Sequence, residues 1–206
     1  MGRPTIHAMP KFDPKIHHRK SIRLQGYDYS QAGTYFVTMV TYHRDPLFGK
    51  IENETMILND LGKIADEYWC AIPKHFPFVE LGAYIIMPNH VHGVIVIRKD
   101  DSVTNGVGAQ HVGATQCVAP TPTITRPTGP KRGSLGAIIG AYKSAVSYRI
   151  HKEHNTTGVW QRNYHEHIIH NEREMDNIWR YIESNPSQWA DDDENPEKQN
   201  MKIKSP

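Results

Sequence analysis

The sequence predicts an α+β domain with a ferredoxin-like βαββαβ core, in which helices cover one face of an antiparallel sheet. Runs rich in β-branched and aromatic residues alternate with segments whose apolar residues recur at helical spacing. The chain has 206 residues, 38% apolar and 22% charged, which suits one globular domain with additional polar segments. The predicted elements are strand 33–42, helix 59–73, strand 79–87, strand 90–97, helix 133–153, strand 158–170 and a final helix 171–186.

The ends of these elements carry recognisable signals. Asn59 or Asp60 can cap the first helix and Pro73 closes it, whereas Ser134 caps the second helix and Pro186 ends the third. A Pro-Asn turn joins the second and third strands into a hairpin. The apolar face of the last helix is predicted to consist of Met175, Ile178, Trp179 and Ile182.

The chain divides into a basic arm (1–25), a folded domain (26–188) and a polar, acidic tail (189–206). Residues 100–131 are rich in Gly, Thr and Pro and lack helical or strand periodicity, so we expect a flexible loop inserted in the domain.

Cysteine usage and the lack of a signal-peptide core lead us to expect a cytoplasmic protein. Cys70 and Cys117 form no CxxC motif, which indicates a reducing compartment without a disulfide framework. The net charge of +2 is close to neutral and says little about partners. No apolar run approaches the roughly 18 residues of a membrane span. We therefore expect no membrane partner, and both a monomer and a homodimer are compatible with the sequence.

The segment "YIIMPNHVHGVIVI", residues 84–97, places two histidines within an apolar run. Because side chains alternate along a strand, His90 and His92 point to the same side and could hold one divalent ion. A pair of histidines on a half-solvated sheet surface is the alternative. On the last helix, Tyr181 and Asn185 are neighbours on one face, with Tyr181 at the flank of the apolar stripe.

Several motifs together resemble the single-tyrosine HUH transposases, and within them the REP-associated tyrosine transposases. These motifs are "HVH" after an apolar strand, Tyr-x-x-x-Asn on a later helix, "VWQRNYHEHII" between them, and "IRLQGYDYSQAGTYFVTMVTYHRDPLFG" near the start. The resemblance covers roughly residues 20 to 188, with the motifs in the family's order. It implies that Tyr181 is the nucleophile and that His90, His92 and Asn185 are the metal ligands.

The resemblance further implies an enzyme that cuts single-stranded hairpin DNA of the REP type through a 5′-phosphotyrosine link and then rejoins strands. A tyrosine of pKa about 10 is only about one part in a thousand phenolate at neutral pH, so a cation at the scissile phosphate would assist it. Histidine ligands suit Mn²⁺ better than Mg²⁺, whereas abundance in the cell favours Mg²⁺.

Tyr164 is the rival nucleophile, because it lies beside His165 and His167 in "NYHEHII". On a strand, however, Tyr164 points away from these two histidines, which we expect to face DNA or to serve the structure.

Tyr27 and Tyr29 could stack on unpaired bases or pack the arm onto the sheet. The other candidate DNA contacts are cations, which can bind phosphates without reading the base sequence. These cations are Arg19, Lys20, Arg23, Lys131, Arg132, Lys143 and Arg162.

Two alternative functions are compatible with the sequence. One is a DNA-hairpin-binding protein without cleavage activity, and the other is a metal-dependent phosphodiesterase that uses water.

Overall fold

The computed structural model describes residues 27–98, 130–192, 194–196 and 198. The predicted basic arm, nearly all of the predicted loop insertion and part of the tail lie outside these residues. The strands are β1 (Gly33–Val40), β2 (Gly49–Glu52), β3 (Thr55–Leu58), β4 (Val79–Ile86), β5 (His90–Ile97) and β6 (His165–Ile169). The helices are α1 (Asp60–Cys70), α2 (Ile72–His75), α3 (Leu135–His154) and α4 (Glu172–Ser184), with 3-10 turns η1 (Tyr42–Arg44) and η2 (Trp189–Asp191).

Four strands form one antiparallel sheet in the order β4-β5-β1-β6. The first strand lies in the middle, between the hairpin strand β5 and the last strand β6, which is the arrangement of a βαββαβ fold. The predicted ferredoxin-like α+β fold is therefore confirmed.

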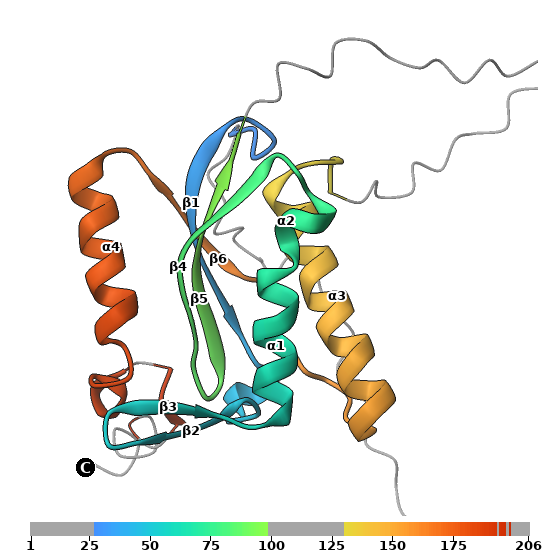
Figure 1. The fold of residues 1–206 in the computed structure, drawn as a ribbon, viewed down its shortest axis with the longest axis vertical. Helices are drawn as coiled ribbons and strands as arrows, with labels where there is room; N and C mark the ends of the chain where they lie inside the picture. The colour runs from blue at the N-terminus through green and yellow to red at the C-terminus, as the bar shows by residue number, and fades with distance from the viewer. Residues whose placement is uncertain (1–26, 99–129, 193, 197, 199–206) are drawn as a thin grey trace, which may run out of the picture.

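Helices cover both faces of this sheet. Figure 1 shows α1 and α3 on one side and α4 on the other. The α1/α3 side holds the main core, including Val91 and Ile95 of β5, whereas Val94 of the same strand packs with Ile182 of α4. Alternation along β5 thus assigns every second residue, including both histidines, to the α4 side.

The α1/α3 side is closely packed around Gly93 and Trp69. A Cβ atom on Gly93 would collide with the indole ring of Trp69, which is buried. The apolar stripe predicted for the second helix, from Leu135 to Val146, is also buried here. Asn59 caps α1 and Ser134 caps α3, both by accepting a hydrogen bond from a backbone N–H in the first turn.

A small hairpin, β2-β3, is absent from the sequence prediction. Each of its strands has four residues, too few for a clear alternation of apolar and polar residues. The available signal was its turn, because Asn53 and Glu54 both have positive φ, at 49° and 60°. Such a two-residue turn matches the twist of a hairpin, and Asn favours it.

Three further predictions were wrong in detail. The last strand of the sheet is His165–Ile169 and not the whole of 158–170, because the preceding residues make only a single bridge, between Trp160 and Thr41. Pro73 does not close α1 but lies in the first turn of α2, where its missing N–H costs no hydrogen bond. Trp179 is 59% exposed and so lies outside the apolar face of α4.

Replacing Gly93 with alanine should lower the free energy of unfolding by roughly 1 to 3 kcal/mol, because the added methyl group displaces the Trp69 ring from a packed position. Gly140→Ala in α3 is the matched control. Its Cβ would meet nothing within 4 Å, so it should raise stability by about 0.5 to 1 kcal/mol through helix propensity. Urea unfolding midpoints measure both effects, and equal midpoints would contradict the packing described.

Candidate functional site

His90 and His92 lie on the α4 side of β5, close to where the strand begins. Their side chains are 0% and 4% exposed, and their ring centres are 4.4 Å apart. The two imidazole rings are therefore buried next to each other, and the alternative prediction of a pair on a half-solvated surface is wrong.

A neighbouring side chain holds the Nδ1 atom of each ring. His90 Nδ1 lies 2.9 Å from Asn89 Oδ1, and His92 Nδ1 lies 2.8 Å from Thr38 Oγ1. The amide nitrogen of Asn89 donates to two backbone carbonyls, so its Oδ1 is the acceptor and His90 Nδ1–H is the donor. In neutral His90, Nε2 then carries the free lone pair, which is the state of a metal-binding histidine.

Burial also keeps both imidazoles neutral. Desolvation lowers the pKa of His92 well below its usual value, and the adjacent His90 lowers it further. Desolvation also lowers the pKa of His90, and the nearby Asp192, Glu194 and Asn185 oppose this effect only in part. Neutral rings can donate their lone pairs to a cation, whereas protonated rings cannot.

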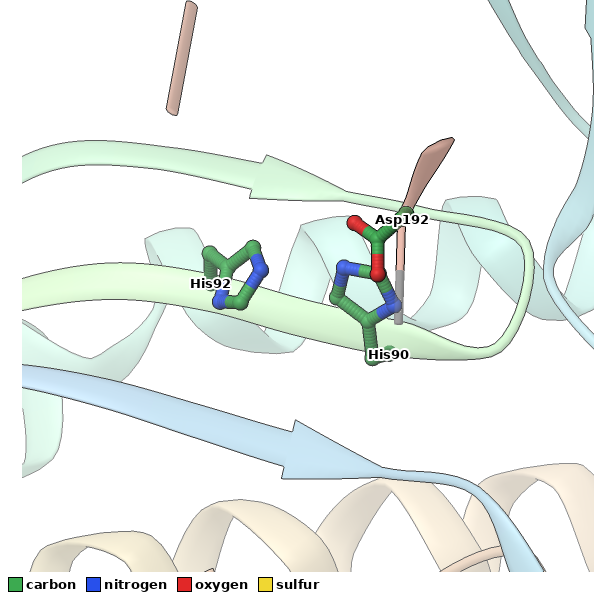
Figure 2. Close-up of side chains that lie close together, drawn as sticks. All are labelled: His90, His92 and Asp192. Carbon is green, nitrogen blue, oxygen red and sulfur yellow. The ribbon is translucent and has the colours of Figure 1, made fainter. Parts of the chain in front are cut away.

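Asp192 joins the two histidines. One potential ligand atom from each of His90, His92 and Asp192 lies within 4.8 Å of the other two. Figure 2 shows the carboxylate of Asp192 beside the ring of His90, with His92 farther along the same strand. Two imidazoles and one carboxylate form a ligand set for a divalent transition metal such as Mn²⁺.

Asn185, the predicted third ligand, supports this cluster from the end of α4. It is 1% exposed, and its Nδ2 donates to Asp192 Oδ2 over 3.2 Å. Its Oδ1 and His90 Nε2 are buried, and neither has a partner with hydrogen-bond geometry among the described residues. A buried imidazole nitrogen and a buried amide oxygen without such partners beside a carboxylate fit a cation, which would satisfy all three.

Asp192 comes from the predicted tail, and several contacts hold this segment against the sheet. Glu194 pairs with Arg44, with 2.6 Å between Oε2 and Nε, and its carbonyl accepts from the Asn89 side chain over 2.7 Å. The ring of Trp189 lies 6.0 Å from that of His90. The segment after α4 is therefore part of the site.

Tyr181 projects from α4 toward the same cluster. Its hydroxyl lies 3.1 Å from His92 Nε2, and its ring packs edge-on against His92 and Phe36. Tyr181 is 41% exposed. A partly exposed phenol beside a candidate metal cluster can attack an electrophile bound there.

A cavity of about 620 Å³ opens in front of these groups. Its wall contains three carboxylates, which would repel a phosphate unless a cation lay between them. The described residues that line it are Thr38, His92, His165, Tyr181, Asn185, Gln188, Asp191, Asp192 and Glu194.

The other histidines and tyrosines near β6 lie in different surroundings. His165 lines the cavity, whereas His167 Nε2 lies 2.5 Å from Glu174 Oε1. Tyr164, the rival nucleophile, is 8% exposed and packs in the main core on the α1/α3 side. Tyr164 and Tyr181 therefore lie on opposite sides of the sheet, and only Tyr181 is next to the histidine pair.

Tyr27 and Tyr29 pack on the sheet, as one of the two alternatives proposed. Their ring centres are 4.8 Å apart, and both contact Tyr35, at 6.5 and 6.1 Å.

The structure separates the predicted DNA-binding cations into three groups. Arg132 and Arg162 are exposed, as is Lys131, which pairs with Asp28 over 3.1 Å. Lys143 differs, because its ammonium donates to the backbone carbonyls of residues 161 and 163, and burial lowers its pKa to about 8. The remaining three, Arg19, Lys20 and Arg23, lie outside the described residues.

Sequence reasoning missed Asp192, Asn89 and Thr38. Asn89 carried a signal, since it directly precedes the histidine motif, but it was interpreted only as a turn residue. Asp192 is one of several neighbouring acidic residues, and nothing in that run distinguishes it.

None of the helices in the described ranges combines the length and apolarity of a membrane span.

No protein-family model matches the chain. A protein of Haemophilus influenzae, described as uncharacterized, is 38% identical over 185 residues, which cover 88% of this chain and 96% of that protein.

One solved structure shares this fold, and another is less similar. A REP-associated tyrosine transposase bound to a REP hairpin has a TM-score of 0.53 and 15% identity, covering 81% of this chain and 74% of its own. A Deinococcus radiodurans protein described as a candidate transposase has a TM-score of 0.40 and 18% identity. The match covers 78% of this chain and 95% of that protein. The chain belongs to the same family as the Haemophilus influenzae protein and has a fold like that of the REP-associated tyrosine transposase.

Proposed function

We propose that this protein is a metal-dependent DNA transposase that cuts and rejoins single-stranded, REP-like hairpin DNA through a 5′-phosphotyrosine intermediate. The observation that carries this proposal is the 3.1 Å contact between the Tyr181 hydroxyl and His92 Nε2, beside His90 and Asp192. A tyrosine in this position is suited to attack a phosphate held beside these residues.

His90, His92 and Asp192 are the proposed ligands of the divalent ion, with Asn185 orienting Asp192 or offering its Oδ1 as a further ligand. The donor set suits Mn²⁺, and Mg²⁺ is the other candidate. When bound, the ion would offset charge that develops on the scissile phosphate and orient that phosphate.

Tyr181 is the proposed nucleophile. In the absence of an ion its hydroxyl can donate to His92 Nε2, which holds the oxygen at the mouth of the cluster. Its attack on phosphorus would form a phosphodiester to the enzyme and release a 3′-hydroxyl end. Because the link is again a phosphodiester, the free 3′-hydroxyl can later attack it and restore the DNA strand without ATP.

DNA is the proposed partner. The structural neighbour with the same fold is described as bound to a REP hairpin. In this chain the exposed cations Lys131, Arg132 and Arg162 are the proposed phosphate contacts within the described residues. Lys143 is not among these proposed contacts, because its ammonium group already donates to two backbone carbonyls.

Wild-type protein mixed with labelled single-stranded hairpin DNA from its host's repeats and with Mn²⁺ should form a covalent protein–DNA adduct on a denaturing gel. Tyr181→Phe should reduce adduct formation by more than about 1,000-fold, because it removes the nucleophilic oxygen. Tyr148→Phe is the matched control, since this tyrosine lies on α3 and is 67% exposed, and it should form the adduct normally.

Other outcomes of that assay would identify a different function. Cleavage that persists in Tyr181→Phe without an adduct would indicate a phosphodiesterase that activates water. Binding without cleavage by the wild-type protein would indicate a DNA-binding protein whose catalytic groups are unused.

Mn²⁺ binding measured by calorimetry should weaken by more than about 100-fold in His90→Ala and in Asp192→Ala, since losing only an outer partner of a ligand costs about 10- to 100-fold. Asp191→Ala is the matched control, because this neighbouring carboxylate lines the cavity outside the three-residue cluster, and it should change the affinity only slightly. Equal losses in the Asp191 and Asp192 variants would show that general negative charge, and not a defined site, attracts the ion.

A further inference from the structure

We propose that His165 is the acid that protonates the 3′-oxygen leaving group when the DNA strand is cut. This inference rests on the proposed function, and it assigns a role to a residue that neither the metal cluster nor the nucleophile requires.

His165, Thr38 and His92 lie side by side on three adjacent strands of the sheet. The register pairs Thr38 of β1 with His92 of β5 on one side and with His165 of β6 on the other. Directly opposite residues on neighbouring strands point to the same face, so all three side chains are on the α4 side. Because strands are about 4.8 Å apart, the backbones of His92 and His165 are separated by roughly 10 Å.

Tyr181 and His165 approach this row from opposite edges of the sheet. In the strand order β4-β5-β1-β6, α4 packs mainly on β4, and Tyr181 reaches from there to His92 on β5. His165 comes from the other edge, on β6, and lines the same cavity. A phosphate bound above Thr38 and His92 would therefore have the phenol on one side and the imidazole on the other.

Phosphoryl transfer requires this opposition, because the attacking and leaving oxygens are roughly in line with phosphorus. With Tyr181 as the attacking group, the leaving 3′-oxygen emerges on the far side, toward β6. An alkoxide is a poor leaving group, so a proton donor on that side would accelerate bond breaking.

Among the described groups that line the cavity, His165 is best suited to this task. The other titratable groups that line the cavity are His92, Tyr181 and the carboxylates of Asp191, Asp192 and Glu194. His92 is a proposed metal ligand and Tyr181 is the proposed nucleophile. A carboxylate only accepts hydrogen bonds and has no proton to donate. His165 has no hydrogen-bond partner among the described residues, whereas His167 on the same side of β6 contacts Glu174.

In the proposed step, one phosphorus–oxygen bond forms as another breaks. The Tyr181 oxygen forms a bond to phosphorus while the bond from phosphorus to the 3′-oxygen breaks, and the electron pair stays on that oxygen. The His165 imidazolium gives its proton to the oxygen, and the phenol proton passes to water in the open cavity. In rejoining, neutral His165 takes the proton from the attacking 3′-hydroxyl.

The test compares two hairpin substrates under single-turnover conditions with the same ion. One is ordinary DNA, and the other has sulphur in place of the bridging 3′-oxygen at the cut site, because a thiolate leaves without protonation. On ordinary DNA, His165→Gln should form adduct about 100- to 10,000-fold more slowly than wild type. On the sulphur substrate it should be within a few-fold of wild type.

His167→Gln is the matched control on the same strand face and should behave like wild type on both substrates. Binding of an uncleavable hairpin and the thermal unfolding midpoint should be unchanged in His165→Gln, which excludes a loss of affinity or of folding.

Two results would overturn the inference. An unchanged rate in His165→Gln on ordinary DNA, or an equal loss on both substrates, would show that His165 only positions DNA or does nothing, while the proposed function would stand. If wild-type protein forms no adduct with either substrate, the proposed function fails and this inference fails with it.

Discussion

The side chain of Asn89 is the interaction on which the site depends. It is fully buried, and its amide nitrogen donates to the carbonyls of Arg44 and Glu194, over 3.0 and 2.7 Å. Its oxygen accepts from His90 Nδ1 over 2.9 Å. One amide therefore fixes the tautomer of His90 and attaches the segment that carries Asp192. A buried amide that satisfies its partners so fully is costly to replace, because each partner would lose its hydrogen bond.

The central sheet adds a second constraint, because the main apolar core lies on one of its faces and the candidate site lies on the other. The α1/α3 side holds the large apolar core, with Trp69 packed against Gly93. The α4 side has a smaller apolar cluster and leaves space for polar residues at one end. Because neighbouring residues of β5 point to opposite sides, the same strand anchors the core and presents two imidazoles. Both imidazoles are thus held by one strand that is paired on both sides, with β4 and with β1.

Much of the fold and several candidate site residues could be predicted from the sequence, because the patterns that indicate them lie within single strands and helices. The alternation in "HVHGVIVI" places His90 and His92 on one side whatever the rest of the fold does, and helical spacing puts Tyr181 beside Asn185. The caps Asn59 and Ser134 follow from local hydrogen bonding in the same way. The β2-β3 hairpin escaped prediction because four-residue strands carry too little pattern.

Other features depend on contacts between residues far apart in the chain, and only the tertiary structure decided them. Asp192 lies in the tail predicted after residue 188, and the contacts of this tail with β5 and with Arg44 bring its carboxylate next to the histidines. The side of the sheet that α4 covers likewise decides that Tyr181, and not Tyr164, lies beside the histidines. The sequence by itself determined which residue types share a strand or helix face, since backbone periodicity is local. The tertiary structure decided which faces meet, because that depends on burying the remaining apolar surface.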